Sequence, residues 1–321
     1  MAVLSIVVPV YFNEGSLDEL ATELISVENS LTEIGIQLEL LFIDDGSRDK
    51  SLDRLHDIRA RRPATKVIQL TRNFGGVNAV QTALRFVSGD CFMFLAADLQ
   101  DPPALILQMA KEWRAGSKYT ICVRRERSDP ILTRLFASVY YRLLRGLLLK
   151  DYPKGGFDLA LMDKSFLPYM RDSAKNVNPN LYGFWMGVEP KTIFYKRNER
   201  KKGRSRWSFS KKLKFFIDTF VGFSFLPIRL ISLVGVTTSA LSFFFGVYTV
   251  FSAFLGVYDG TPGYATLVSL FLFLLGLIIF MLGVVGEYLW RILDEVNKRP
   301  RAVIEHAWGI DPTDISQQGV P

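Results

Sequence analysis

The residues best suited to chemistry are the acidic and amide side chains in the string at positions 98–103. This string directly follows Cys91–Ala97, a short apolar run that is typical of a buried strand in a parallel sheet. Ligands of open α/β sheets bind just beyond the carboxyl ends of such strands. The oxygens of Asp98, Gln100 and Asp101 are of the kind that Mg²⁺ or Mn²⁺ prefers. The alternative for the same residues is an ordinary helix start, with an aspartate N-cap before a proline.

Two earlier strand ends place polar groups at the same predicted sheet edge. The second of them carries adjacent aspartates before a Gly-Ser turn, and these acceptors suit the donor groups of a ribose or a base. An aromatic side chain after the first strand can pack against a base. The resulting nucleotide-binding candidates are Pro9, Tyr11, Asn13, Glu14, Asp44, Asp45 and Ala97.

An acidic cluster repels a diphosphate unless a divalent cation lies between them, so this constellation implies a nucleotide together with a metal. The chain has no Gly-rich phosphate loop of the ATPase type, and no dinucleotide fingerprint follows the first strand. The sequence therefore has no phosphate-binding motif of the kind that a P-loop kinase, an ATPase or a dehydrogenase uses. An Asp-Gly pair alone is a common turn. Its position between a strand and a helix, level with a second acidic strand end, favours a ligand role.

Strand-like and helical patterns alternate along the first two hundred residues, which predicts an α/β domain with a doubly wound, mostly parallel sheet. The predicted strands are Leu4–Val10, Leu38–Ile43, Lys66–Leu70, Cys91–Ala97 and Tyr119–Val123, with Lys191–Tyr195 as a last edge strand. The predicted helices are Ser16–Thr32, Lys50–Arg61, Val77–Val87, one beginning near Pro103 and one between Asp129 and Gly156.

Two long uncharged segments, Leu230–Tyr258 and Gly260–Gly286, are each long enough as a helix to cross a hydrocarbon core of about 30 Å. Residues 196–214 before them are densely basic, and the turn between them has no basic residue. The positive-inside rule then predicts a multi-pass protein of the cell's inner membrane, with the first two hundred residues and both termini in the cytoplasm. The net charge of +7 lies mostly in this basic belt, and the apolar segments that follow it argue against nucleic acid as the partner.

Apolar residues from Phe209 to Phe220 recur on one helical face with lysines on the other, which predicts an interfacial helix; a core-facing helix is the alternative. The predicted divisions are a nucleotide-binding domain at 1–207, the interfacial helix at 208–229, two membrane helices at 230–290 and a cytoplasmic tail at 291–321. The polar, proline-containing part Asp294–Pro321 is expected to be loosely ordered. Small residues in the membrane segments allow close helix packing. Because only two spans support a large domain, we expect a homo-oligomer.

The chain resembles a known group in several motifs taken together. These are Val8–Tyr11, Asp44–Ser47, Ala97–Pro103, Arg124, the Gly155–Phe157 turn, the arginine-rich run 197–207 and the close at 298–300. They resemble the family-2 glycosyltransferases of GT-A fold, in the polyisoprenyl-phosphate branch that includes bactoprenol glucosyltransferases and dolichol-phosphate mannose synthases. The resemblance covers nearly the whole chain, and the two apolar spans point to the bactoprenol glucosyltransferase type.

This resemblance implies inverting transfer of a sugar from a nucleotide sugar to a polyprenyl phosphate such as undecaprenyl phosphate. UDP-glucose is the first candidate for the nucleotide sugar. It implies Mg²⁺ or Mn²⁺ as cofactor and a hexosyltransferase of the β-glucosyl type. Alternatives are the same reaction with mannose, galactose, GlcNAc or aminoarabinose, a processive polysaccharide synthase, and a non-catalytic nucleotide-sugar-binding membrane protein. The acceptor phosphate is largely dianionic because its second pKa is about 6, so it needs a general base less than a hydroxyl does.

The resemblance also assigns roles to single residues. Asp98, Arg124 and Asp158 are the catalytic candidates, and Asp158 either orients the sugar, acts as a base or pairs with a nearby cation. The candidates for binding the acceptor phosphate are Arg124, Arg134, Arg200, Arg204, Ser205, Arg206 and Lys211. The chain departs from the family pattern at Ala96, where an aspartate is frequent, and at Phe12, which interrupts a Tyr-Asn-Glu motif.

Overall fold

A computed structural model describes residues 1–125, 131–175, 177–197, 209–224, 226–255, 264–297 and 299–311. The chain divides into two units. One comprises Met1–Asp218 and Pro300–Pro321, and the other comprises Thr219–Arg299. The first unit contains the sheet and the candidate site, and the second contains the long apolar helices.

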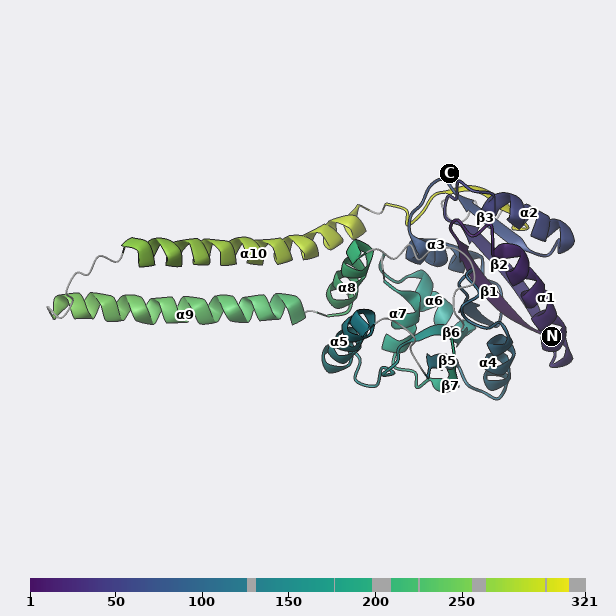
Figure 1. Cartoon of the computed structure of the whole chain (residues 1–321), viewed down its shortest axis with the longest axis horizontal. Helices are drawn as coiled ribbons and strands as arrows, with labels where there is room; N and C mark the ends of the chain where they lie inside the picture. Colours follow the sequence, from purple (N-terminus) through teal and green to yellow (C-terminus); the bar gives the residue numbers. More distant parts are fainter. Residues whose placement is uncertain are drawn as a thin grey trace. The chain divides into compact units, whose positions relative to one another are not determined.

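An eight-stranded sheet of order β7-β5-β6-β4-β1-β2-β3-β8 forms the centre of the first unit (Figure 1). β1 is parallel to β2 and β4, β2 to β3, and β5 to β7, whereas β6 and β8 are antiparallel to their neighbours. The predicted α/β class with a mostly parallel sheet is therefore confirmed. The strands are β1 Ala2–Val10, β2 Ile36–Asp44, β3 Lys66–Leu70, β4 Cys91–Phe94, β5 Tyr119–Arg124, β6 Phe157–Asp163, β7 Lys191–Tyr195 and β8 Ile304–Trp308.

Helices cover both faces of this sheet (Figure 1). α1, α2 and α4 pack on one face, and α3 and α7 pack on the other. The helices of this unit are α1 Leu17–Glu33, α2 Ser51–Arg61, α3 Gly76–Ala83, α4 Ala104–Arg114, α5 Ile131–Leu147, α6 Leu167–Arg171 and α7 Pro179–Trp185. α7 shows a complete helix start, because Pro179 occupies the first turn and the Asn178 side chain accepts from two backbone N–H groups.

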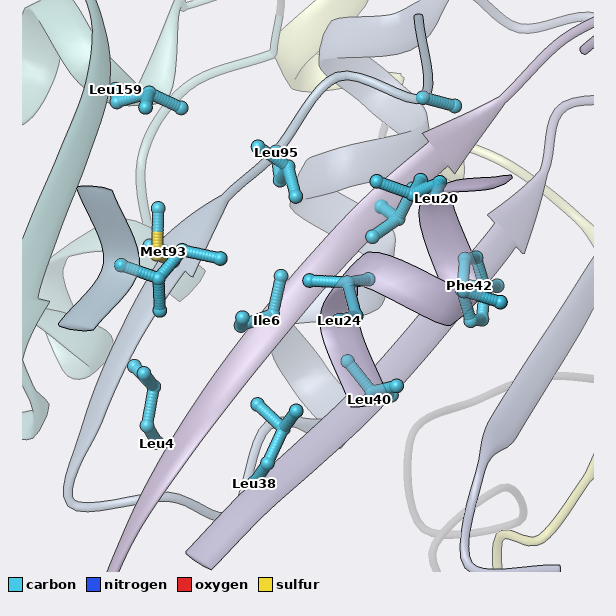
Figure 2. Packing of buried hydrophobic residues seen from close by; sticks show 14 of the residues in the cluster. Leu4, Ile6, Leu20, Leu24, Leu38, Leu40, Phe42, Met93, Leu95 and Leu159 are labelled. Carbon is cyan, nitrogen blue, oxygen red and sulfur yellow. The ribbon is translucent and has the colours of Figure 1, made fainter. Parts of the chain in front are cut away.

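The main hydrophobic core lies between α1, α4 and the strands they cover (Figure 2). Alternate residues of β1, such as Leu4 and Ile6, point toward the same layer as Leu40 and Phe42 of β2 and Leu24 of α1. All five side chains are fully buried, and each such burial stabilises the fold by about 1.5–3 kcal/mol. This rigid layer ends at the carboxyl ends of β1, β2 and β4, where the polar segments begin.

The first five predicted strands, the predicted edge strand Lys191–Tyr195 and the predicted helices are confirmed, with three differences in detail. The strand predicted at Cys91–Ala97 already ends at Phe94. The helix predicted at Val77–Val87 changes to a 3₁₀ turn at Leu84–Phe86. The turn predicted at 155–158 is shorter, because Phe157 already begins β6, which inserts antiparallel between β4 and β5.

The prediction of a loosely ordered tail at Asp294–Pro321 is wrong for two segments of its described part, because helix α10 (Tyr264–Val296) extends into it and a strand forms further on. Ile304–Trp308 forms β8, which pairs antiparallel with β3 from Val67 opposite Trp308 to Leu70 opposite Ile304. Backbone pairing to an open sheet edge explains how a short polar segment becomes ordered, because the edge offers a row of unpaired N–H and C=O groups. Residues 312–321 lie outside the described part.

The second unit contains the helices α9, Leu226–Phe254, and α10, Tyr264–Val296, which lie side by side (Figure 1). Each has a stretch long and apolar enough to cross a membrane, at Pro227–Phe245 and Phe273–Val296. Large apolar side chains such as Phe244 and Phe280 are exposed along them. Gly235 permits close approach of the two helices, since a Cβ added there would lie 2.8 Å from the Met281 Cε.

Helix α8, Phe209–Phe223, crosses the boundary between the two units and includes the segment predicted to lie at the membrane interface. Its helical state is confirmed. Its interfacial role and the predicted domain boundaries remain predictions.

Candidate active site

Three strand ends meet at one edge of the sheet and are tied together by hydrogen bonds. The segment after β1 bonds to the segment after β2, because the Phe12 N–H donates to Ser47 Oγ at 3.0 Å and the Asn13 N–H to Ser51 Oγ at 2.8 Å. The same segment bonds to the end of β4, because Ser16 Oγ donates to the Ala97 carbonyl at 2.6 Å. The convergence predicted from the sequence is therefore present.

Asp44, the last residue of β2, offers an unused acceptor at this edge. Its side chain is fully buried, and Oδ2 accepts from the Ser47 N–H at 3.1 Å. Oδ1 has no hydrogen-bond partner among the described residues. Burial raises the pKa of this carboxyl, and the bonds from Ser47 oppose that rise. A buried acceptor without a donor is costly, so the site is suited to a ligand that brings an N–H or O–H group.

The side chain of Asp45 has different hydrogen-bond partners from that of Asp44. Oδ1 accepts from the Phe74 N–H at 2.7 Å, and Oδ2 accepts from Asn73 Nδ2 and the Gly75 N–H, both at 3.0 Å. Burial raises the pKa of Asp45 to about 6, although these bonds oppose the rise. Both oxygens of Asp45 accept from the loop after β3, so Asp45 positions that loop. Direct nucleotide contact by Asp45 remains a prediction.

Gly46 lets the same loop approach the end of β2. Its φ is +68°, and a Cβ added there would lie 2.6 Å from the carbonyl carbon of Arg72. We expect Gly46→Ala to lower the free energy of unfolding by about 1–3 kcal/mol and to weaken nucleotide binding, since backbone must move. Chemical denaturation of the purified protein measures the first effect. Gly187→Ala is the matched control, with φ +76° and open space around its Cβ position; equal destabilisation by both changes would contradict the prediction.

The other nucleotide-binding candidates after β1 shape the turn. Asn13 Oδ1 accepts from the Tyr11 N–H at 2.9 Å, and the exposed Glu14 accepts from the Lys50 N–H at 3.0 Å at the start of α2. Phe12 between them has a φ of +57°, a conformation rarely adopted by a bulky residue. Pro9 lies within β1, and Tyr11 is half-buried at its end.

The end of β4 carries the metal candidates. Asp98 is half-buried and its Oδ1 accepts from the Gln100 N–H at 3.2 Å. Leu99 between them has a φ of +57°. Positive φ at two non-glycine residues, Phe12 and Leu99, on neighbouring strand ends is the kind of local strain that concentrates at functional sites.

Asp101 is buried and engaged within the protein. Its Oδ1 accepts from the Tyr195 hydroxyl at 2.5 Å and lies 3.2 Å from Arg197 Nε. Burial and the nearby Asp158 charge raise its pKa, whereas Arg197 and Tyr195 oppose the rise. The alternative of a helix start with Asp101 as N-cap is wrong, because Pro103 is the N-cap of α4 and no side chain caps it.

These positions permit a test of whether a divalent cation fits. Among the described residues, no group of three or more His, Cys, Asp or Glu side chains is arranged to hold a metal. Mg²⁺ is commonly held by one or two carboxylates with substrate phosphates completing the shell. Asp98 and Gln100 fit such a partial shell, whereas Asp101 already serves a hydroxyl and a guanidinium, so we leave Asp101 out of the proposed metal set.

Arg124 and Asp158 form an ion pair where β5 ends and β6 begins. The side chain of Arg124 is 14% exposed and that of Asp158 is 35% exposed. Burial lowers the pKa of Arg124, but the charge and hydrogen bond of Asp158 together with the nearby Tyr195 and Asp101 outweigh that effect, so the net direction of the pKa is upward. Of the three roles predicted for Asp158, the structure shows pairing with a cation.

The Gly155–Gly156 turn beside this pair has no room for side chains. A Cβ on Gly155 would lie 2.9 Å from the Arg124 carbonyl oxygen, and one on Gly156, where φ is +66°, would clash with the Tyr141 ring of α5. The two glycines therefore allow α5 and the end of β5 to pack directly against the turn.

A cleft of about 890 Å³ opens next to Arg124. Arg125 and Lys154 add positive charge to its walls, and Tyr141 and Phe194 add aromatic surface. The full lining is Val123, Arg124, Arg125, Ser138, Tyr141, Asp151, Pro153, Lys154, Gly155, Thr192 and Phe194. Three basic side chains outnumber the acidic Asp151 in this lining, so the cleft is suited to an anionic ligand that also has apolar surface.

Several predicted acceptor residues cannot be compared with this geometry. Arg200, Arg204, Ser205 and Arg206 lie outside the described residues. Arg134 and Lys211 lie on α5 and α8, but their side chains are outside the described part.

Sequence reasoning missed the roles of Tyr195, Arg125 and Lys154. Tyr195 reads as an ordinary strand residue, and nothing in the sequence links it to Asp101, which lies 94 positions away. The basic pair Arg124–Arg125 at a predicted strand end was the available signal for Arg125.

Acidic strand ends on a mostly parallel α/β sheet fit a glycosyltransferase, and comparison with known families shows that class. The family model "Glycosyl transferase family 2" matches residues 5–178, and "GtrB C-terminal hairpin" matches residues 226–292. The chain belongs to glycosyl transferase family 2, and a C-terminal hairpin of the GtrB type follows the matched domain. The sequence-based resemblance is thus confirmed.

Relatives include an uncharacterized glycosyltransferase, YkcC, of Bacillus subtilis, which is 34% identical over 96% of this chain and 94% of the relative. The SfII prophage-derived bactoprenol glucosyl transferase of Shigella flexneri is 29% identical over 84% of this chain and 87% of its own length. The undecaprenyl-phosphate 4-deoxy-4-formamido-L-arabinose transferase of Shewanella sediminis is 29% identical over 94% of this chain and 91% of its own length.

Proposed function

We propose that this protein transfers a sugar, with glucose from UDP-glucose as the first candidate, to polyprenyl phosphate at the cytoplasmic face of the membrane, with inversion at the anomeric carbon. The observation that carries the proposal is the unused, buried acceptor of Asp44 at the end of β2, which β1 separates from the end of β4 that carries Asp98. The relatives that act on bactoprenol or undecaprenyl phosphate support the acceptor class, and their different sugars leave the donor to experiment.

Different residues of the site are proposed to bind the sugar donor and the lipid acceptor. Asp44 Oδ1 accepts a hydrogen bond from the nucleoside, while Asp45 and the loop it holds set the shape of that end. Asp98 and Gln100 are the residues that would hold Mg²⁺ or Mn²⁺ against the donor diphosphate, and the cation would supply Lewis-acid stabilisation of the leaving group. Arg124 faces a cleft suited to a lipid phosphate and would orient it.

The acceptor phosphate is the nucleophile of the proposed reaction. One of its oxygens forms a bond to the anomeric carbon as the bond from that carbon to the diphosphate breaks, which releases the nucleoside diphosphate. Because the phosphate is already an anion, no residue needs to remove a proton from it. The ion pair of Asp158 with Arg124 agrees with this, since Asp158 then orients a cation rather than acting as a base.

Incubation with radiolabelled UDP-glucose and undecaprenyl phosphate, with and without Mn²⁺, tests the proposal. We expect one sugar to enter an organic-soluble product. A long polymer would indicate a processive synthase, and binding of donor without any transfer would indicate a non-catalytic binder. A parallel donor series with mannose, galactose, GlcNAc and aminoarabinose nucleotides identifies the sugar.

Asp44→Asn provides a direct test of nucleotide recognition. The amide keeps the size of the side chain and one acceptor for the Ser47 N–H, but it places a donor NH₂ where Oδ1 is unused. Two donors would then face each other, so we expect UDP affinity to fall about 10- to 100-fold by calorimetry. Asp53→Asn on the exposed side of α2 is the control. Unchanged UDP affinity in Asp44→Asn would contradict the assignment.

We also propose two membrane-crossing helices with both termini in the cytoplasm, and a homo-oligomer in the membrane. The exposed apolar surfaces of α9 and α10 and the basic segment before α9 support this topology. Cysteine labelling from either side of the membrane tests the topology, and detergent-corrected light scattering tests the oligomer.

A further inference from the structure

The segment that follows α10 returns to the sheet and binds beside the loop that Asp45 holds. β8 pairs with β3, and the carbonyl of Val303 just before it accepts from the Thr71 N–H at 3.0 Å. Thr71 begins the loop at 71–75 that leads from β3 to α3. The returning segment therefore bonds to this loop by backbone as well as extending the sheet.

Arg301 adds a second attachment near α3. Its guanidinium donates to the Arg171 carbonyl at 2.9 Å and to the Ser173 carbonyl. Ser173 Oγ in turn accepts from the Nε2 of Gln81, a buried residue of α3, at 3.2 Å. Arg301 is thus linked to the helix that directly follows the 71–75 loop.

The far end of β8 is fixed as well. The Trp308 ring meets the His56 ring of α2 edge to face at 4.5 Å. Gly309, with φ +74°, lies so close to β3 that a Cβ would be 2.9 Å from the Thr65 carbonyl oxygen. A segment with three separate attachments is held in one register along β3.

The 71–75 loop thus has two supports. On one side Asp45 accepts from Asn73, Phe74 and Gly75, and on the other the Val303 carbonyl accepts from Thr71. Asp45, the first of these supports, directly follows Asp44 in the sequence. Asp44 Oδ1 has no hydrogen-bond donor among the described residues. Movement of the loop would therefore change the end of β2 where a nucleotide is proposed to bind.

We propose that Arg301 and β8 are positioning elements of the nucleotide-sugar site, which fix the 71–75 loop so that Asp44 and Gly46 keep their binding geometry. This inference rests on the proposed function. The competing explanation is that β8 only covers an open sheet edge, in which case it contributes to stability and not to donor affinity.

Arg301→Ala in the full-length protein separates the two explanations. Loss of two hydrogen bonds to carbonyl groups is expected to raise the KM for the donor and the Kd for UDP by roughly 3- to 10-fold. The KM for undecaprenyl phosphate should stay within about twofold of wild type, because Arg301 is not among the described residues that line the cleft beside Arg124. Hydrogen exchange at residues 71–75 should accelerate in the variant.

The control is Arg299→Ala, which removes the same charge two residues earlier; Arg299 is exposed and has no hydrogen bond or ion pair with the described residues. Should Arg301→Ala fold poorly, Arg301→Lys keeps one donor and is expected to give a smaller rise in donor KM. Unchanged donor KM and UDP affinity in an active Arg301 variant, with or without a lower melting temperature, would overturn the inference. Absence of transfer and of UDP binding in the wild type would instead overturn the proposed function.

Discussion

Asp98→Asn is expected to lower kcat about 100- to 1,000-fold, the size of effect found when one group that stabilises developing charge is removed. Asparagine can still accept from the Gln100 N–H, so the turn after β4 is preserved while the negative charge is lost. Without that charge a cation is held less tightly against the diphosphate. Mn²⁺ affinity measured by electron paramagnetic resonance should fall in parallel, in the absence of any turnover.

Removal of metal from the wild type with a chelator should reproduce most of the loss seen in Asp98→Asn. Asp53→Asn, on the exposed face of α2, serves as the charge-matched control and should leave the rate unchanged. Full turnover by Asp98→Asn in the presence of chelator would remove the basis for a cation at this strand end.

Arg124→Met is expected to reduce kcat/KM for the lipid acceptor about 10- to 100-fold, since a charge-assisted hydrogen bond to phosphate is worth about 1.5–3 kcal/mol. Methionine retains much of the apolar stem, so the cleft beside α5 keeps its shape. Donor affinity should change little. Steady-state kinetics with the donor and the lipid varied separately provides the measurement.

Asp158→Asn distinguishes orientation of Arg124 from general-base catalysis. If Asp158 orients its partner, the loss in Asp158→Asn is smaller than in Arg124→Met and the pH profile keeps its form. A larger loss together with a flattened profile would show that Asp158 acts as a base. Arg114→Met, at the exposed end of α4, controls for removal of one positive charge.

The sequence predicted the central strands well because each is a short apolar run with a turn after it, and burial on both faces leaves few alternatives. β6 and β8 were missed for a different reason. Their pairing depends on partners far along the chain, such as Val67 opposite Trp308 and Cys91 opposite Asp163. Local pattern carries no signal for a partner at such a distance.

For the site, the sequence identified which strand ends carry acids but not which oxygens remain available. Asp44 and Asp45 are adjacent and chemically identical. They differ because residues 73–75 donate hydrogen bonds to the oxygens of Asp45, whereas Asp44 Oδ1 accepts none from the described residues. Asp101 likewise looked like a metal ligand or a helix cap until Tyr195 and Arg197 were placed against it. Such assignments depend on tertiary contacts that no local motif encodes.

The order of β8 along the chain has a consequence for biosynthesis. This strand is translated only after both α9 and α10, yet it completes the sheet that begins with β1. Strands β1 to β7 can assemble as they leave the ribosome, but the β3 edge stays open until the hairpin has been made. A nascent chain truncated within the hairpin would leave the β3 edge unpaired and open to aggregation and proteolysis. Pairing of β8 with β3 is therefore possible only after both apolar helices have been synthesised.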